Sequence, residues 1–160
     1  MTEIKDANVR SPSYFVATAH VSCWHCGSPT LVLGLAMPQS HEVLDDELPS
    51  DVWHCAGGNA FLFYVEGLPD PVRDRLAALS PLFRRAASTV TLNSYWANHC
   101  EHCGTLLGDH ELHCEPEGPF MPSSEASAAA IELLQIHEPF EAVAAGYALE
   151  PEFFGFMRKR

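Results

Sequence analysis

The chain has 160 residues, a length that suits one domain with its own hydrophobic core. Hydrophobic residues make up 47% of it, which is typical of a globular protein and excludes a largely disordered one. The formal net charge of −12 disfavours nucleic acid as a partner, because affinity for nucleic acid comes largely from Lys and Arg side chains that neutralise phosphates.

The N-terminal segment, residues 1–12, is polar and has no apolar region of the kind found in secretory signals, so we predict a flexible N-terminus there. The longest apolar run, residues 30–37, is too short to cross a bilayer, and no membrane association is expected. A cytoplasmic protein follows, in which thiols stay reduced. The six cysteines then favour metal ligation over a disulfide framework.

Two predicted strands enclose a Cys-x-x-Cys-Gly turn near the start of the chain. Residues 13–21 are rich in β-branched and aromatic side chains, which favour a strand. The turn, with Cys23 and Cys26, follows at once, and residues 30–37 are predicted to return as a second strand. Gly27 follows the second cysteine, where a positive φ is often required and glycine adopts it without steric cost. This order is the layout of a zinc knuckle on a β-hairpin.

The middle of the chain is predicted to contain a loop, a strand and a helix. Residues 39–51 are acidic and match no EF-hand spacing, so a solvated loop is favoured over a calcium site. Residues 60–65 are apolar and aromatic and form a predicted strand. Asp70 then caps a helix that has Pro71 at its first position. The face expected to be buried consists of Val72, Leu76 and Leu79.

A second Cys-x-x-Cys-Gly turn contains Cys100 and Cys103. A strand predicted for residues 86–96 leads into it, residues 104–108 mirror the first hairpin, and residues 111–114 are expected to complete its return. The two turns are the one internal repeat in the sequence.

The C-terminal part is predicted to add a helix and a strand. Ser123 or Ser124 caps a helix that runs to about residue 136, and residues 140–149 fit a final strand. The predicted fold class is therefore α+β, an antiparallel sheet with two zinc-knuckle hairpins and two or three helices. Residues 13–157 are predicted to form a single zinc-stapled domain.

The paired turns supply four thiolates, the ligand count of a closed tetrahedral zinc site. A gap of two residues lets two thiolates on one tight turn reach one ion at about 2.3 Å each, and backbone amides of the turn then stabilise the sulfurs. Between Cys26 and Cys100 lie 73 residues, enough for an inserted unit that folds back. We predict one structural zinc ion held by Cys23, Cys26, Cys100 and Cys103.

Three other interpretations of the paired turns compete with a zinc site. An iron–sulfur cluster also uses four thiolates. A thioredoxin-like redox motif would place the two cysteines between a strand and the start of a helix, whereas turns are expected after both motifs here. Buried reduced cysteines would explain neither the pairing nor the repeated glycine.

The remaining cysteines, Cys55 and Cys114, could form a second site together with nearby histidines. That candidate set is His54, Cys55, Asp109, His110, His113 and Cys114. The competing interpretation, which we favour, is that each free cysteine is a small buried hydrophobe. The histidines that flank the four ligands, His25, His99 and His102, are expected to face solvent or to support the ligands.

The second turn and its flanks resemble a family pattern. Residues 94–104 read Ser-Tyr-Trp-Ala-Asn-His-Cys-Glu-His-Cys-Gly, followed by Gly-Asp at 108–109 and Leu-His at 112–113. Together with a Cys-Trp-x-Cys turn near the N-terminus, this resembles uncharacterised bacterial zinc-ribbon-like proteins. The resemblance implies a zinc-binding fold with no assigned activity. It also implies the ligands Cys23, Cys26, Cys100 and Cys103, with Asn98, Asp109 and His113 in supporting positions.

From these features we expect a zinc-binding protein that meets a protein partner through an exposed apolar or aromatic surface, which would show as an exposed patch near Trp24 or Trp96. For the two tryptophans themselves, the interpretation that we favour is that they cover the metal and fill the core. The alternatives are an enzyme with a separate site around His110, His113 and Cys114, or a metal sensor or reservoir. No catalytic residue and no oligomeric state can be assigned from the sequence. A closed four-cysteine site presents no metal-bound water, so catalysis would need its own residues.

Overall fold

The computed structural model describes residues 6–44, 52–87, 94–115, 118–149, 151 and 153–160, and within them twelve strands join in one sheet. The strands are β1 (Val9–Ser11), β2 (Tyr14–Ser22), β3 (Pro29–Met37), β4 (Glu42–Leu44), β5 (Trp53–Cys55), β6 (Ala60–Gly67), β7 (Arg84–Ala87), β8 (Ser94–His99), β9 (Leu106–Leu107), β10 (Glu132–Ile136), β11 (Phe140–Leu149) and β12 (Arg158–Lys159). The helices are α1 (Asp70–Leu79), a π-helical turn η1 (His110–Cys114), α2 (Glu125–Ala129) and a 3-10 turn η2 (Phe154–Phe156).

The main path of the sheet runs in the order β12-β10-β2-β3-β6-β11-β1-β4-β5. A short branch leaves it where β8 pairs with β6, and β8 also pairs with β7 and β9. The long β2–β3 hairpin is third and fourth along this path, with an unbroken antiparallel register from Phe15 opposite Ala36 to Ser22 opposite Pro29. The first Cys turn lies at the end of this hairpin.

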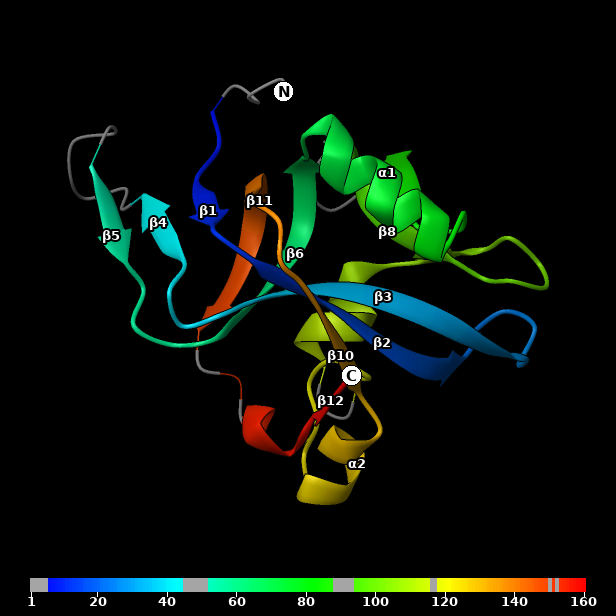
Figure 1. The fold of residues 1–160 in the computed structure, drawn as a ribbon. Coiled ribbons are helices and arrows are strands. Elements are labelled where there is room, and N and C mark those ends of the chain that lie inside the picture. Colours follow the sequence, from blue (N-terminus) through cyan, green and yellow to red (C-terminus); the bar gives the residue numbers. More distant parts are fainter. Residues whose placement is uncertain (1–5, 45–51, 88–93, 116–117, 150, 152) are drawn as a thin grey trace.

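The β2–β3 hairpin separates two hydrophobic clusters, because successive side chains of a strand point to opposite faces. Val16 and Leu35 belong to the first cluster, which α1 covers, while Ala17 and Ala36 belong to the second. Figure 1 shows α1 on one side of the hairpin and α2 with η2 on the other. Burial on both faces explains why residues 30–37 form an almost continuous apolar run.

Helix α1 forms within one residue of its predicted start, and both its buried face and its N-cap differ from the prediction. Val72 and Leu76, spaced by one turn, are buried, whereas Leu79 is 36% exposed at the end of the helix. Pro69 is the N-cap, so Asp70 is the first helical residue and not the cap.

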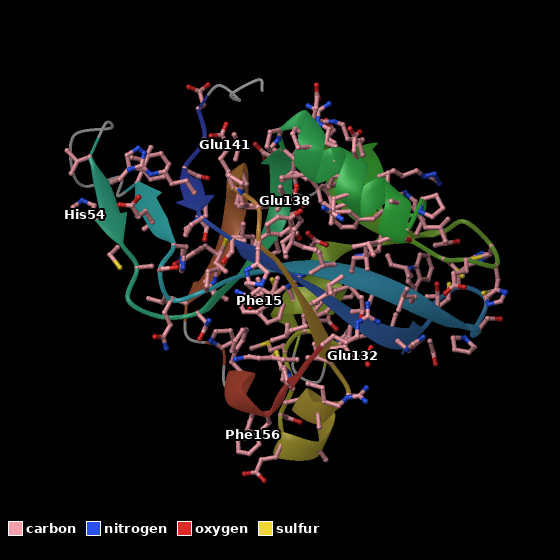
Figure 2. The ribbon with its side chains drawn as sticks, viewed as in Figure 1. Phe15, His54, Glu132, Glu138, Glu141 and Phe156 are labelled. Carbon is pink, nitrogen blue, oxygen red and sulfur yellow. The ribbon has the colours of Figure 1, made fainter. Side chains whose placement is uncertain are left out.

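At the other edge of the molecule, Phe156 in η2 is half exposed and projects outward (Figure 2).

The predicted fold class is wrong. The protein consists mainly of strands, and its sheet is mixed, because β12 runs parallel to β10. The helix predicted up to residue 136 stops at Ala129, with Ser124 as its cap in a reciprocal capping box with Ser127. Residues 132–136 instead form β10, which pairs with β2. Satisfying the open backbone groups of the β2 edge outweighs the favourable helix propensity of this segment, whose Glu, Leu and Gln residues are good helix formers.

The second hairpin is also shorter than expected. Its return is β9, and residues 111–114, expected to continue that strand, belong to the π-helical turn η1. Of the strand predicted for residues 86–96, the described ends are the antiparallel pair β7 and β8, and its centre at 88–93 lies outside the described residues.

Within the acidic loop predicted at residues 39–51, Glu42–Leu44 form the strand β4, and residues 45–51 lie outside the described residues. At the N-terminus, Val9–Ser11, within the segment expected to be flexible, forms β1 and pairs with both β11 and β4. No helix in the described part of the chain is long and apolar enough to cross a membrane.

Candidate metal centre

The first Cys turn connects β2 to β3 and is closed by two backbone hydrogen bonds. The Cys23 amide donates to the Ser28 carbonyl at 2.9 Å, and the Gly27 amide donates to the Cys23 carbonyl at 2.8 Å. Gly27 has φ +77°, so the predicted positive φ after the second cysteine is confirmed. Only glycine adopts this conformation without steric cost, and the turn therefore presents both cysteine side chains on one side.

The second Cys turn, between β8 and β9, repeats this geometry. The Cys100 amide donates to the Thr105 carbonyl at 2.9 Å, and the Gly104 amide donates to the Cys100 carbonyl at 3.0 Å. Gly104 has φ +74°. Each Cys-x-x-Cys motif thus lies between two antiparallel strands, and neither has the strand-to-helix position that a thioredoxin-like redox motif requires.

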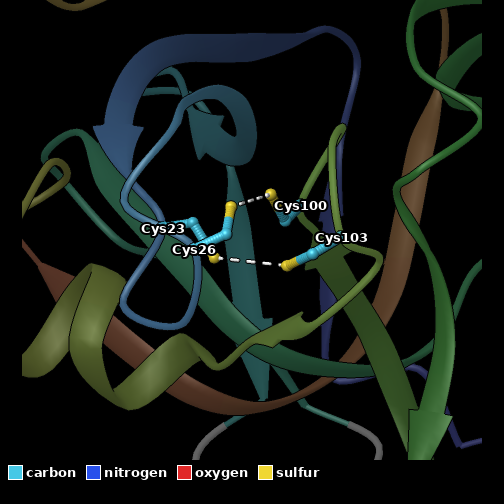
Figure 3. Close-up of side chains that lie close together, drawn as sticks. All are labelled: Cys23, Cys26, Cys100 and Cys103. Carbon is cyan, nitrogen blue, oxygen red and sulfur yellow. Dashed lines mark hydrogen bonds between the residues drawn. The ribbon is translucent and has the colours of Figure 1, made fainter.

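The two turns face each other and bring four sulfur atoms together (Figure 3). The Sγ atoms of Cys23 and Cys103 are 3.6 Å apart, as are those of Cys26 and Cys100, and all four lie within 4.8 Å of one another. Metal–sulfur bonds of about 2.3 Å in a tetrahedron place sulfur atoms about 3.8 Å apart. The four cysteines can therefore hold a single metal ion with little rearrangement.

Each turn contributes one buried and one exposed cysteine. Cys23 and Cys100 are buried, and an amide of the turn donates to each: His25 to the Cys23 sulfur at 3.4 Å and His102 to the Cys100 sulfur at 3.3 Å. Such N–H···S bonds stabilise the thiolate, the form that binds metal. His25 and His102 thus support the ligands through their backbone.

Hydrogen bonds lower the pKa of both thiols in the second turn. For Cys100 the backbone amides of Cys103 and His102 lower the pKa. For Cys103, hydrogen bonds from the side chain and then the backbone of Thr105 lower the pKa to about 5, and Thr105 Oγ1 lies 3.1 Å from its sulfur. These two sulfurs are therefore prepared to act as thiolate ligands.

Side chains of each turn also reach the strand that follows the other turn. Trp24 Nε1 in the first turn donates to the Leu106 carbonyl at 3.2 Å, and His102 Nε2 in the second donates to the Pro29 carbonyl at 3.2 Å. These reciprocal hydrogen bonds hold the two turns in position relative to each other without a bound ligand.

Glu101 strengthens this connection from inside the second turn. Its carboxylate accepts from the Leu31 amide at 2.6 Å, and its own amide donates to Thr30 Oγ1 at 3.0 Å. The sequence assigns no role to Glu101 and Thr30, because Glu101 occupies a variable position of the Cys-x-x-Cys motif and the contact joins residues 71 positions apart.

Asn98 joins β8 to β3 with its side chain instead of a backbone ladder. Its amide nitrogen donates to the Leu33 carbonyl at 2.9 Å, and its amide oxygen accepts from the Leu33 amide at 2.8 Å. Asn98 is 2% exposed, so both bonds are shielded from water. The residue expected from the resemblance to be a supporting position is thus the buried polar link between the strands that carry the two turns.

The second cluster considered from the sequence is not brought together. Within the described residues, the four cysteines form the one group of three or more ligand-type side chains close enough to share a metal ion. His54 and Cys55 lie on the short strand β5, whereas His110, His113 and Cys114 belong to η1. Cys55 is exposed and Cys114 is partly exposed, so the interpretation of both as buried hydrophobes is also wrong.

Asp109 has a structural position at the start of η1. Its carboxylate accepts from the Tyr64 amide at 2.7 Å, and its amide donates to the Tyr95 hydroxyl at 3.3 Å. Tyr64 has φ +50°, so this contact holds β6 at a point of unusual backbone conformation. Burial, with a smaller repulsion from Glu111, raises the pKa of Asp109 to about 7.

Asp109→Asn is expected to change how stability depends on pH. The folded pKa of about 7 lies above the ordinary value, so between about pH 4 and pH 7 the folded state binds one more proton than the unfolded state. Across that range the free energy of unfolding of the wild type falls by about 1.4 kcal/mol per pH unit relative to the variant, and above pH 7 the difference becomes constant. The asparagine keeps an oxygen to accept from Tyr64. Urea unfolding of both proteins at pH 5, 6, 7 and 8 measures the effect, and parallel pH profiles would contradict it.

The two tryptophans near the turns differ in exposure. Trp96 is buried, and the guanidinium groups of Arg73 and Arg85 lie over its ring at 5.1 and 4.5 Å. Trp24 is 69% exposed. An aromatic surface beside the metal centre therefore involves Trp24 and not Trp96.

Comparisons of the chain with protein-family models, with curated proteins and with solved structures found no match. The resemblance to zinc-ribbon-like proteins is thus supported as far as the four clustered cysteines and no further.

Proposed function

We propose that this protein binds one zinc ion at Cys23, Cys26, Cys100 and Cys103, and that the ion has a structural role. The observation that carries the proposal is the convergence of four sulfurs, all within 4.8 Å, from two turns of the same geometry. Zinc is the metal that four thiolates in a tetrahedron commonly hold in structural sites. With four protein ligands no position is left for water or substrate, which favours a structural over a catalytic ion.

The spacing of the sulfurs favours one ion over an iron–sulfur cluster. A cluster would place at least two irons and their bridging sulfides between the thiolates and would hold them further apart. The pairs at 3.6 Å in the present arrangement match the edges of a tetrahedron around one ion.

A structural ion would connect two parts of this fold that share little backbone pairing. The second turn is attached to the main path of the sheet by little backbone pairing, since β8 meets β6 at a single register pair, Val65 opposite Trp96. The ion would join the end of the β2–β3 hairpin to the β8–β9 turn, which lie 73 residues apart in the chain. Metal binding that closes such a long loop contributes directly to folding free energy.

We further propose that the protein acts by binding a protein partner, with Trp24 in the contact surface. The exposed indole of Trp24 is held in place by the hydrogen bond of its Nε1 to Leu106. A large aromatic side chain that is already ordered loses little entropy on binding, and tryptophan is enriched among residues that dominate interface energies.

Metal content per chain tests the zinc proposal. Elemental analysis of untagged protein, purified with its thiols reduced, is expected to find one zinc per chain. More than one metal per chain would favour the alternative of a metal sensor or reservoir. Reduced, folded protein without any metal would overturn the proposal.

A further inference from the structure

A cavity of about 250 Å³ opens beside β6 and β11, on elements other than the Cys turns. Its wall is largely aromatic and apolar, and none of the described residues that line it is charged. The lining consists of Phe61, Phe63, His113, Phe120, Met121 and Ala148, together with two prolines.

His113 is the polar group of this cavity. It is 9% exposed, and its ring is stacked between Phe63, at 5.3 Å and 18°, and Phe120, at 4.9 Å and 26°. Among the described residues, neither ring nitrogen of His113 has a hydrogen-bond partner. Burial lowers the pKa of His113 to about 3, so the ring is neutral at pH 7. A neutral imidazole offers one donor and one acceptor, and no residue in the described part of the chain uses either of them.

The stack around His113 depends on a close contact with Gly146. This glycine lies opposite Phe63 in the pairing of β11 with β6, and a Cβ atom added to it would be 2.1 Å from the Phe63 ring. The absence of a side chain at this position lets the Phe63 ring lie flat against His113. The side of the cavity wall formed by β6 and β11 is therefore closely packed.

We propose that this cavity binds a small, uncharged, planar aromatic molecule that carries one hydroxyl or similar group, with His113 as its hydrogen-bond partner. A ligand hydroxyl at this wall can donate to or accept from the imidazole of His113, and such a hydrogen bond is stronger in apolar surroundings than in water. The site is separate from the metal centre and does not depend on the zinc proposal.

The size and chemistry of the cavity define the class of ligand. A closed apolar cavity of about 150 Å³ is sufficient for benzene, so the larger space here suits a molecule of one or two fused rings. The phenylalanine rings of the wall favour a planar ligand by stacking. A charged ligand is disfavoured because no described lining residue can neutralise it, and burying an unpaired charge is costly.

The test uses three naphthalene-based probes at pH 7 on the 160-residue protein as purified, with any bound metal retained: 2-naphthol, naphthalene and 2-naphthoate. Titration calorimetry is expected to show 2-naphthol binding at one site per chain, about five- to tenfold tighter than naphthalene, for a gain of one hydrogen bond. 2-Naphthoate is expected to bind more weakly than both. Equal affinity for 2-naphthol and naphthalene would overturn the role of His113, and no binding of either at saturation would overturn the site.

Variants locate the site and separate its two features. His113→Phe keeps the stacked ring and is expected to abolish the difference between 2-naphthol and naphthalene. Ala148→Leu fills the cavity and is expected to weaken both probes at least tenfold, whereas Ala145→Leu, at an exposed position of the same strand, leaves both unchanged. An Ala148→Leu protein that binds as the wild type does would overturn the location.

A measurement on the wild type makes the test independent of how well the variants fold. The ring nitrogens of His113 are expected to shift in the nitrogen NMR spectrum when 2-naphthol binds, and to shift much less with naphthalene. Binding of 2-naphthol without any change at these nitrogens would overturn the proposed hydrogen bond.

Discussion

Cys100→Ser is expected to lose the metal ion and with it most of the tertiary structure. Apparent binding free energies for structural zinc in small domains are about 10 to 16 kcal/mol, as large as the whole stability of a typical domain. Cys100 is 1% exposed in the second hydrophobic cluster, so a serine there also buries a hydroxyl group. A second ligand variant is needed to separate loss of metal from loss of packing.

Cys26→Ser provides that separation, because Cys26 is an exposed member of the same four ligands. It is expected to lose zinc and cooperative unfolding as Cys100→Ser does. Cys55→Ser, at an exposed cysteine outside the group, is the matched control and should keep both. Elemental analysis and near-ultraviolet circular dichroism of the three variants measure the effect. A stable, cooperatively folded Cys26→Ser protein without metal would show that the ion is not structural.

Asn98→Ala is expected to cost about 3 kcal/mol while the metal remains bound. The substitution leaves both the amide and the carbonyl of Leu33 without partners in a buried position, and each such group costs about 1 to 3 kcal/mol. The four cysteines are unchanged, so the protein should still contain one metal ion per chain. Urea unfolding at saturating zinc, together with metal analysis, measures both quantities.

Asn8→Ala is the matched comparison for Asn98→Ala. Asn8 makes the same pair of bonds, donating to the Ala144 carbonyl at 2.8 Å and accepting from the Ala144 amide at 2.9 Å, but in a partly buried position. Water can replace the lost partners there, and the expected cost falls to about 1 kcal/mol. Equal losses in the two variants would show that burial of the Asn98 link adds nothing.

The local features of this protein could be predicted from its sequence. The two Cys turns depend on a few adjacent residues and on glycines at positive φ, so their sequence pattern predicts their geometry. Strands β2, β3 and β6 and helix α1 have apolar patterns of the matching period, and they form close to their predicted positions.

The non-local features could not be predicted. The sequence of residues 132–136 predicts the end of a helix. These residues form a strand because they pair with the open edge of β2. The parallel pairing of β12 depends on where the C-terminal segment returns to the sheet. His113 was considered as a metal ligand or a base, because nothing in the sequence shows that Phe63 and Phe120 enclose its ring. In each case the deciding neighbour comes from a distant or separately folded segment.

The distance along the chain between the two Cys turns has a consequence for synthesis. After Cys26 leaves the ribosome, a further 73 residues must follow it out before Cys100 does. At about 5 to 20 residues per second this interval is about 4 to 15 seconds. During it, the nascent chain presents two thiols without their partners, open to oxidation or to a wrong metal. Zinc supply and a reducing environment are therefore expected to affect the yield of this protein during translation more than after it.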